Sequence, residues 1–90
     1  MWGKARKKPI EIQFREPIPN DNIEYGLYTE PKFLPVEWVE TREGKIVAIP
    51  GKDYVIKGIQ GELYPIKINI FNESYDVIQS LSEKVKNNED

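Results

Sequence analysis

The chain has 90 residues, with 13 basic and 15 acidic side chains and a formal net charge of −2. This balance argues against a protein that binds nucleic acid through its overall charge, and a chain of this length forms one domain. It contains no cysteine and no histidine, which excludes disulfide bonds, a thiolate nucleophile, a sulfur-ligated zinc site and a histidine general base. We therefore predict no enzyme activity, no metal site and no cofactor.

Residues 1–8 contain four basic side chains, Lys4, Arg6, Lys7 and Lys8. Such a cluster suits a contact with phosphate or with an acidic partner. The rest of the sequence offers no matching basic face, which favours a solvated basic arm and makes nucleic acid an unexpected partner. No apolar run approaches the about 18 residues that a transmembrane helix needs, so no membrane partner is expected.

Residues 9–14 predict a half-buried strand, because the apolar side chains of Ile10, Ile12 and Phe14 alternate with polar ones. Pro9 fits the first position of an edge strand, where no ladder donor is needed. Residues 16–35 are irregular and broken by prolines. Here Asn20 to Asn22 predict either a turn or the cap of a short helix over 23–27. Three aromatic residues of this region are expected to pack onto the sheet: Tyr25, Tyr28 and Phe33.

Residues 36–41 and 45–49 predict a hairpin, because Glu43-Gly44 between them is a turn signal. Its register stays open. A two-residue loop places Trp38 opposite Ile49, and a three-residue loop with a glycine bulge places it opposite Ala48. In either register Trp38 is expected in the core.

Residues 53–57 and 62–66 predict a second hairpin, closed by the segment from Gly58 to Gly61. Loops of two or four residues give one register, in which Ile56 faces Leu63 and both point to the core. The opposite face then carries Val55, Tyr64, Lys57 and Glu62. Pro65 lacks a ladder donor, which predicts an edge strand at this position.

Residues 67–74 fit either a short strand or a helical turn. After Tyr75, apolar residues at helical spacing predict a helix, formed by Val77, Ile78, Leu81 and Val85. The predicted fold is mainly β: a small antiparallel barrel or two-layer β-roll of about five strands with a C-terminal α-helix. One domain over 1–90 comprises a basic arm (1–8), a β core (9–75) and a helical tail with a frayed end (76–90).

A binding surface is the functional prediction that the residues favour over catalysis. Its candidates mix cation, amide and aromatic groups around the second hairpin: Lys57, Gln60, Glu62, Tyr64 and Lys67. Such a set suits a protein partner or a phosphorylated small molecule, and a plain solvated sheet face fits it as well.

Two catalytic or phosphate-binding alternatives are weaker. The spacing of Gly58 and Gly61 matches the glycine pair of the RNA-binding KH loop, but both flanks are typical of strands, which favours a hairpin turn. Asp53 and Glu62 could form a carboxylate pair, but the predicted register puts Asp53 opposite Ile66, several residues from Glu62.

The C-terminal half also resembles a known family. It reads Pro50-Gly51, then Asp53 to Gly58, Gly61 to Pro65, Ile70-Phe71 and Tyr75. This is similar to the signature Pro-Gly-Asp-Tyr-Ile-Ile-Lys-Gly-x-x-Gly-Glu-Phe-Tyr-Pro of small bacteriophage and prophage accessory proteins. The start, with Arg6 to Pro9 and Gln13-Phe14, fits the same family. Two departures are the inserted Lys52 and Ile66, which stands where the family has a cysteine.

The resemblance implies origin more than activity, because members of this family are mostly of unassigned function. It implies expression in the cytoplasm of a bacterial host. Small phage accessory proteins commonly bind and block host proteins, including those of antiviral defence, so a non-enzymatic inhibitor of a host target is the leading expectation. One alternative is a homo-oligomeric sponge that sequesters a nucleotide signal molecule, and another is a structural or assembly component of the phage.

Overall fold

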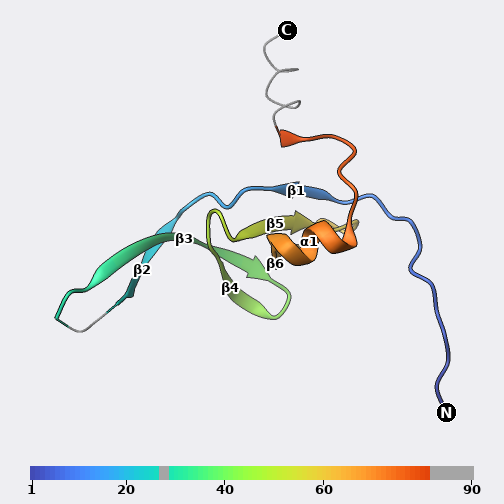
Figure 1. Cartoon of the computed structure of the whole chain (residues 1–90), viewed down its shortest axis with the longest axis horizontal. Helices are drawn as coiled ribbons and strands as arrows, with labels where there is room; N and C mark the ends of the chain where they lie inside the picture. The colour runs from blue at the N-terminus through green and yellow to red at the C-terminus, as the bar shows by residue number, and fades with distance from the viewer. Residues whose placement is uncertain (27–28, 82–90) are drawn as a thin grey trace, which may run out of the picture.

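The computed structural model describes residues 1–26 and 29–81, which form six strands and one helix (Figure 1). The strands make two antiparallel sheets of three strands each, ordered β1-β5-β6 (the first sheet) and β2-β3-β4 (the second sheet). The prediction of a mainly β fold with a C-terminal helix is confirmed, with six strands in two layers and no closed barrel. The elements are β1 (Gln13–Arg15), β2 (Asp21–Tyr25), β3 (Lys32–Thr41), β4 (Gly44–Ala48), β5 (Asp53–Lys57), β6 (Leu63–Lys67) and α1 (Ile68–Ser74).

The core is built around β5, the central strand of the first sheet. Neighbouring residues of a strand point to opposite faces, yet Val55 and Ile56 are both fully buried. Val55 joins Val39 and Ala48 of the second sheet in one apolar cluster, with Leu63 packed against it. The strand is therefore covered on both faces, by the second sheet on one and by α1 and its neighbours on the other.

The layer over the second face is aromatic and centres on Phe71 of α1. Its ring lies 4.8 Å from that of Phe14, 5.0 Å from that of Tyr54 and 5.3 Å from that of Tyr75, measured between ring centroids. The helix has no side-chain cap at its N-terminus. We infer that burial of Phe71, more than helix propensity, holds this short helix in place.

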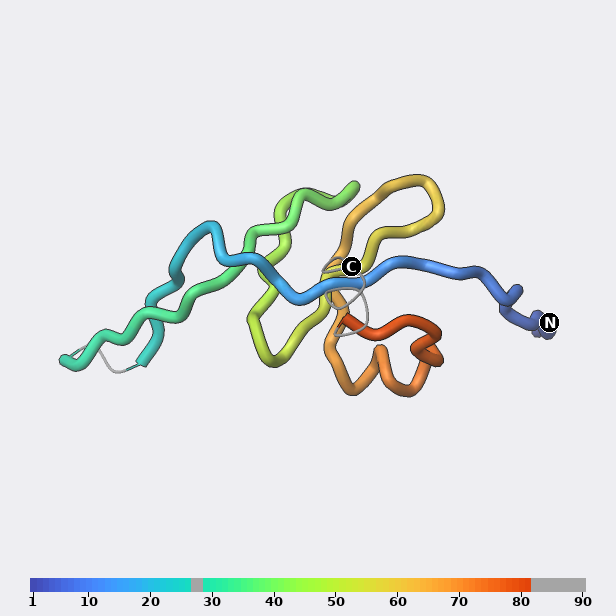
Figure 2. Tube along the Cα trace, turned by 90° about the horizontal axis from the view of Figure 1, so that it is seen from above, coloured from blue at the N-terminus to red at the C-terminus, as the bar shows by residue number. Residues whose placement is uncertain are grey.

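Strand β3 spans ten residues and serves two hairpins. Its first half pairs with β2, from Lys32 opposite Tyr25 to Val36 opposite Asp21, and its second half pairs with β4. The side chain of Asn20 extends the first ladder by accepting from the backbone N–H of Trp38 at 2.9 Å. Residues 20–26 and 29–36, which we call the arm, project from the body as a two-stranded ribbon (Figures 1 and 2).

The predicted register of the second hairpin is wrong by one residue. Lys57 lies opposite Leu63 and Ile56 opposite Tyr64. The cause is the turn: the N–H of Gly61 donates to Gly58 O at 3.0 Å, and Gly61 adopts a φ of 82°. The loop therefore holds an odd number of residues and forms a glycine bulge.

This slip exchanges the side chains of β6 between the two faces of the sheet. Tyr64 joins Ile56 on the aromatic side, and Leu63 joins Val55 and Lys57 on the other. The prediction that Val55, Lys57, Glu62 and Tyr64 share a face is therefore wrong. The edge position predicted for Pro65 is confirmed, since β6 is an outer strand of its sheet.

Both registers considered for Trp38 are also wrong, because it lies opposite Val47. The two-residue turn consists of Arg42 and Glu43, so Gly44 follows the turn instead of forming it. Trp38 lies on the outer face of the second sheet and is partly exposed, not in the core.

Residues 9–25 differ from the predictions at three points. β1 starts only at Gln13, since its partner β5 ends at the opposite residue Lys57 and offers nothing for residues 9–12 to pair with. In place of a turn or short helix after Asn20, the chain forms β2. Two of the three aromatic residues expected to pack onto the sheet, Tyr25 and Phe33, are exposed on the arm; Tyr28 lies outside the described residues.

At the C-terminus, the helical alternative for residues 67–74 is confirmed by α1. Residues 75–80 of the predicted tail are not helical. The remainder of that prediction, residues 82–90 with Val85, lies outside the described residues.

Candidate functional site

The structure does not bring the five predicted ligand-binding residues together at one site. Lys57 and Lys67 lie at opposite ends of the β5–β6 ladder, since Lys57 is opposite Leu63 and Lys67 is opposite Asp53. Four strand steps separate these ends, about 13 Å. Tyr64 points to the other face of the sheet. Of the five, only Gln60 and Glu62 come together, at the turn between β5 and β6.

At that turn, Gln60 and Glu62 meet a residue that the sequence did not single out, Arg42 of the β3–β4 turn. The guanidinium of Arg42 donates to the side-chain oxygen of Gln60, and its Nη2 lies 3.5 Å from Oε2 of Glu62. We call residues 41–44 and 58–62 the paired turns. Figure 2 shows them next to each other on the side of the body away from the arm.

The β5–β6 turn is also held by its own hydrogen bonds. The N–H of Gly58 donates to Glu62 O at 2.9 Å, and the N–H of Gln60 donates to Oε1 of Glu62 at 3.1 Å. A Cβ at Gly58 would collide with the Glu62 carboxylate, so glycine is what lets this side chain fold back. The turn displays Ile59 to solvent, with 70% of its surface exposed.

Tyr64 belongs to the aromatic layer and not to a surface site. Burial, followed by a hydrogen bond with Tyr75, raises the pKa of its phenol from 10.0 to about 12. A phenol in this position is protonated at neutral pH, so it contributes a hydrogen bond and packing, not a charge.

The raised pKa of Tyr64 gives a testable alkaline titration. The proton is held more tightly in the folded state, so its stabilising contribution is complete below the ordinary value of 10.0 and is lost as pH rises towards about 12. We expect the phenolate absorbance of the folded protein to show a step near pH 12 that Tyr64→Phe removes. The control Tyr25→Phe, on the exposed arm, is expected to keep that step; its persistence in Tyr64→Phe would contradict the assignment.

Asp53 has a structural role that accounts for its burial. Its Oδ2 accepts from the backbone N–H of Ile49 at 2.8 Å, and its own N–H donates to Ile49 O at 2.9 Å. These bonds close the turn from Ile49 to Asp53. Glu62 lies at the other end of the ladder, so the two carboxylates do not form an acid–base pair.

An ion pair that the sequence did not predict joins Arg15 of β1 to Glu37 of β3. It is bidentate, with N–O distances of 2.7 and 2.8 Å, and Glu37 also accepts from the N–H of Ile18 at 2.8 Å. The hydrogen bonds from Arg15 lower the pKa of the buried Glu37 carboxyl below its ordinary 4.5. The pair joins β1 of the first sheet to β3 of the second, and we interpret its role as structural.

A shallow groove of about 950 Å³ runs between residues 7–14 and 74–81. Lys7 lies against its rim, with Nζ 4.8 Å from the centroid of the Tyr75 ring. The remaining lining is mixed and mostly exposed, so nothing in it converges on a single point.

Neither a family model, nor a curated protein, nor a solved structure matches the chain. Within residues 1–26 and 29–81, no group of three acidic side chains is placed to hold a metal ion. In the same residues, the structure contains no helix of the length and apolar character needed to cross a membrane.

Proposed function

We propose that the chain is a non-enzymatic binding protein of phage origin that occupies the surface of a host protein in the bacterial cytoplasm and blocks it. The resemblance to phage accessory proteins supports the origin, and an antiviral defence protein is the target that this origin favours. The structural roles of Asp53 and Glu62 support binding over catalysis, because both candidate carboxylates are already engaged in holding turns.

The paired turns are the contact surface that we propose, and the hydrogen bonds that link and brace them are the observation that carries it. Ile59 projects from a turn that Arg42, Gln60 and Glu62 hold in one conformation. An exposed apolar side chain ringed by polar groups resembles the centre and rim of a protein interface. A turn that its own hydrogen bonds brace loses less conformational entropy when a partner covers it.

The test compares two isoleucines of similar exposure. Tagged wild-type protein, Ile59→Asp and Ile78→Asp are expressed in the bacterial host, purified under native conditions and weighed by native mass spectrometry. Ile59 and Ile78 are 70% and 76% exposed, so both substitutions should leave the fold intact. We expect a host protein at fixed stoichiometry with the wild type and with Ile78→Asp.

With Ile59→Asp the host protein is expected to be lost, because a carboxylate would have to be desolvated at the centre of the interface. Thermal melting of the three proteins shows whether the fold is unchanged. Retention of the same host protein by Ile59→Asp would remove the paired turns from the proposal. A bound mass of nucleotide size, in place of a protein, would replace the blocking function by sequestration of a small molecule.

A further inference from the structure

The arm exposes two aromatic side chains to solvent. Tyr25 is 49% and Phe33 is 65% exposed. Tyr25 lies opposite Lys32 and Phe33 lies opposite Glu24, which puts the two rings on opposite faces of the ribbon. The part of the ribbon that carries these rings lies beyond the buried Val36, and an isolated two-stranded ribbon is at best marginally stable in water. The arm therefore has the character of a surface that another chain covers.

The charge of the arm restricts what that chain can be. Three carboxylates lie along the arm, those of Asp21, Glu24 and Glu30, against the single cation of Lys32. In residues 1–26 and 29–81, the ion pairs are formed elsewhere, by Arg15 with Glu37, Arg42 with Glu62 and Lys45 with Glu40. The arm thus offers unpaired negative charge beside exposed rings, which suits a partner with cations and an aromatic group.

The N-terminal segment of the same chain has this composition. Residues 1–8 carry Trp2, which is fully exposed, and the cations of Lys4 and Arg6, which make no ion pair within the described part of the chain. Lys7 is held against the ring of Tyr75 and fixes the base of the segment. The six residues before it are extended and reach about 20 Å at most.

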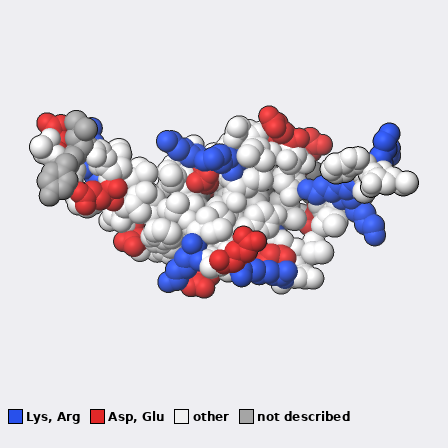
Figure 3. Space-filling view, turned by 90° about the horizontal axis from the view of Figure 1, so that it is seen from below, with Lys and Arg blue, Asp and Glu red and all other residues white. Residues whose placement is uncertain are grey.

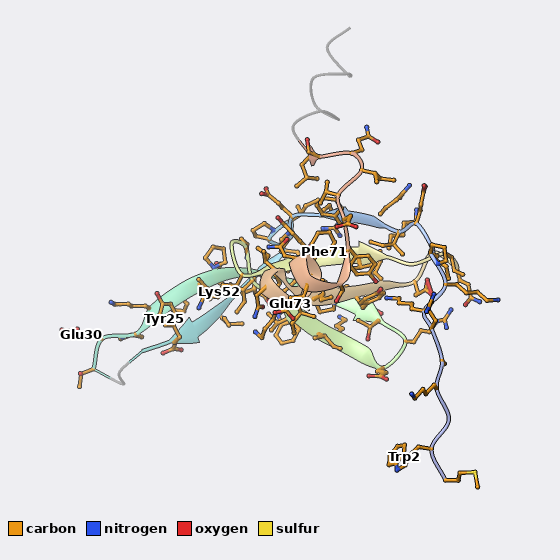
Figure 4. The ribbon with its side chains drawn as sticks, turned by 45° about the vertical axis from the view of Figure 1, so that its right-hand side comes forward. Trp2, Tyr25, Glu30, Lys52, Phe71 and Glu73 are labelled. Atoms are coloured by element: carbon orange, nitrogen blue, oxygen red, sulfur yellow. The ribbon has the colours of Figure 1, made fainter. Side chains whose placement is uncertain are left out.

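The segment does not reach the arm of its own chain. The two lie at opposite ends of the long axis, which measures 53 Å (Figure 1). Figure 3 shows acidic side chains at the end of the molecule that the arm forms and basic side chains at the other. Figure 4 shows Trp2 projecting at one end, with Tyr25 and Glu30 at the other.

We propose that the arm is covered by the N-terminal segment of a second copy of the chain. The segment of one copy lies along the edge strand β2 of the next, with Lys4 and Arg6 against Asp21 and Glu24, which flank that edge on its two faces. Trp2 packs on one of the two exposed rings of the arm. Because the two surfaces differ, the contact is heterologous, and an open assembly of any length retains one free segment at one end and one free arm at the other. Such a contact repeats, and it produces a ring where the rotation closes and a filament where it does not.

Sedimentation velocity and light scattering test this on the full-length protein. We expect the mean mass of the wild type to rise with concentration at about 50 mM salt and to fall to that of the monomer at about 500 mM, because exposed charges are screened. A charge reversal at either end, Lys4→Glu with Arg6→Glu or Asp21→Lys with Glu24→Lys, is expected to weaken association at least about tenfold.

The decisive measurement is a mixture of the two reversed proteins. Each alone has two like-charged ends and is expected to be monomeric. In an equal mixture, the acidic segment of the first variant matches the arm of the second variant, which the substitutions make basic. The unchanged basic segment of the second variant likewise matches the unchanged acidic arm of the first. Association should therefore return, with the two variants strictly alternating. One chain carrying all four substitutions is expected to associate by itself. Circular dichroism confirms that each variant keeps its strands.

The effect of net charge by itself is tested by Lys52→Glu with Lys57→Glu. This variant changes the net charge as much as Lys4→Glu with Arg6→Glu does, but on the body, and it should leave association unchanged. Deletion of residues 2–6 should abolish association without altering the fold. A wild type that is monomeric at all concentrations in low salt would overturn the proposal. So would association that persists in both reversed proteins, or a mixture in which mass does not return.

Discussion

Phe71→Ala is expected to lower the free energy of unfolding by about 3–5 kcal/mol, the range for removing a large buried aromatic side chain. Only 2% of Phe71 is exposed, and its ring contacts the rings of Phe14, Tyr54 and Tyr75. A domain of this length has a total stability of about 5–13 kcal/mol. The substitution therefore removes a large share of that stability, as chemical denaturation at neutral pH would measure.

The matched control is Ile70→Ala, one residue earlier on the same helix and 46% exposed. It is expected to cost less than about 1 kcal/mol, because little apolar surface is lost from the core. The comparison separates burial from helix propensity, since alanine is the better helix former in both cases. Equal losses in the two variants would show that Phe71 does not hold α1 against the sheet.

Arg15→Met is expected to lower the free energy of unfolding by about 2–4 kcal/mol at neutral pH. The substitution leaves the buried Glu37 carboxylate without its bidentate partner, and an uncompensated buried charge is costly. Arg15 itself is partly exposed, which places the expected loss below that of a fully buried pair. The control Arg42→Met breaks the exposed contact with Glu62 and is expected to cost at most about 1 kcal/mol.

The same pair predicts a pH dependence. The pKa of Glu37 is lowered in the folded state, so its stabilising contribution is fully present above the ordinary value of 4.5 and is lost as pH falls below it. The difference between wild type and Arg15→Met is therefore largest near neutral pH and shrinks in acid. Urea denaturation between pH 7 and pH 3 measures it; a difference that is constant over this range would contradict the ion pair as its cause.

Local patterns predicted much of the body from the sequence. Alternation and turn residues give β5 with the bounds that the structure shows, and Pro65 predicts the edge position of β6. The helical alternative for residues 67–74 also depends only on residues that are close together in the sequence. These features depend on neighbouring residues in the chain, which is why a single sequence contains them.

The predictions that the structure contradicts were wrong for two physical reasons. The register of a hairpin depends on the backbone conformation of single turn residues. Gly61 has a positive φ, which gives the loop an odd number of residues. For this reason Tyr64 lies in the aromatic layer and not in the predicted site. Long-range pairing is the other cause. The mostly polar residues of β2 form a strand because they pair with β3. Arg15 and Glu37, which form an ion pair, are 22 residues apart in the sequence.

The pairing of β1 with β5 joins segments about 40 residues apart, whereas the other ladders are hairpins between consecutive strands. Closing so long a loop costs conformational entropy before any contact offsets it, so sheets that depend on distant pairs fold slowly. The three hairpins can form early, and we expect β1 to dock last and set the folding rate. Pulsed hydrogen exchange would show this order as late protection of the β1 amides. Until that step, Phe71 and Glu37 lack their partners on β1, and the backbone groups along one edge of β5 are unpaired.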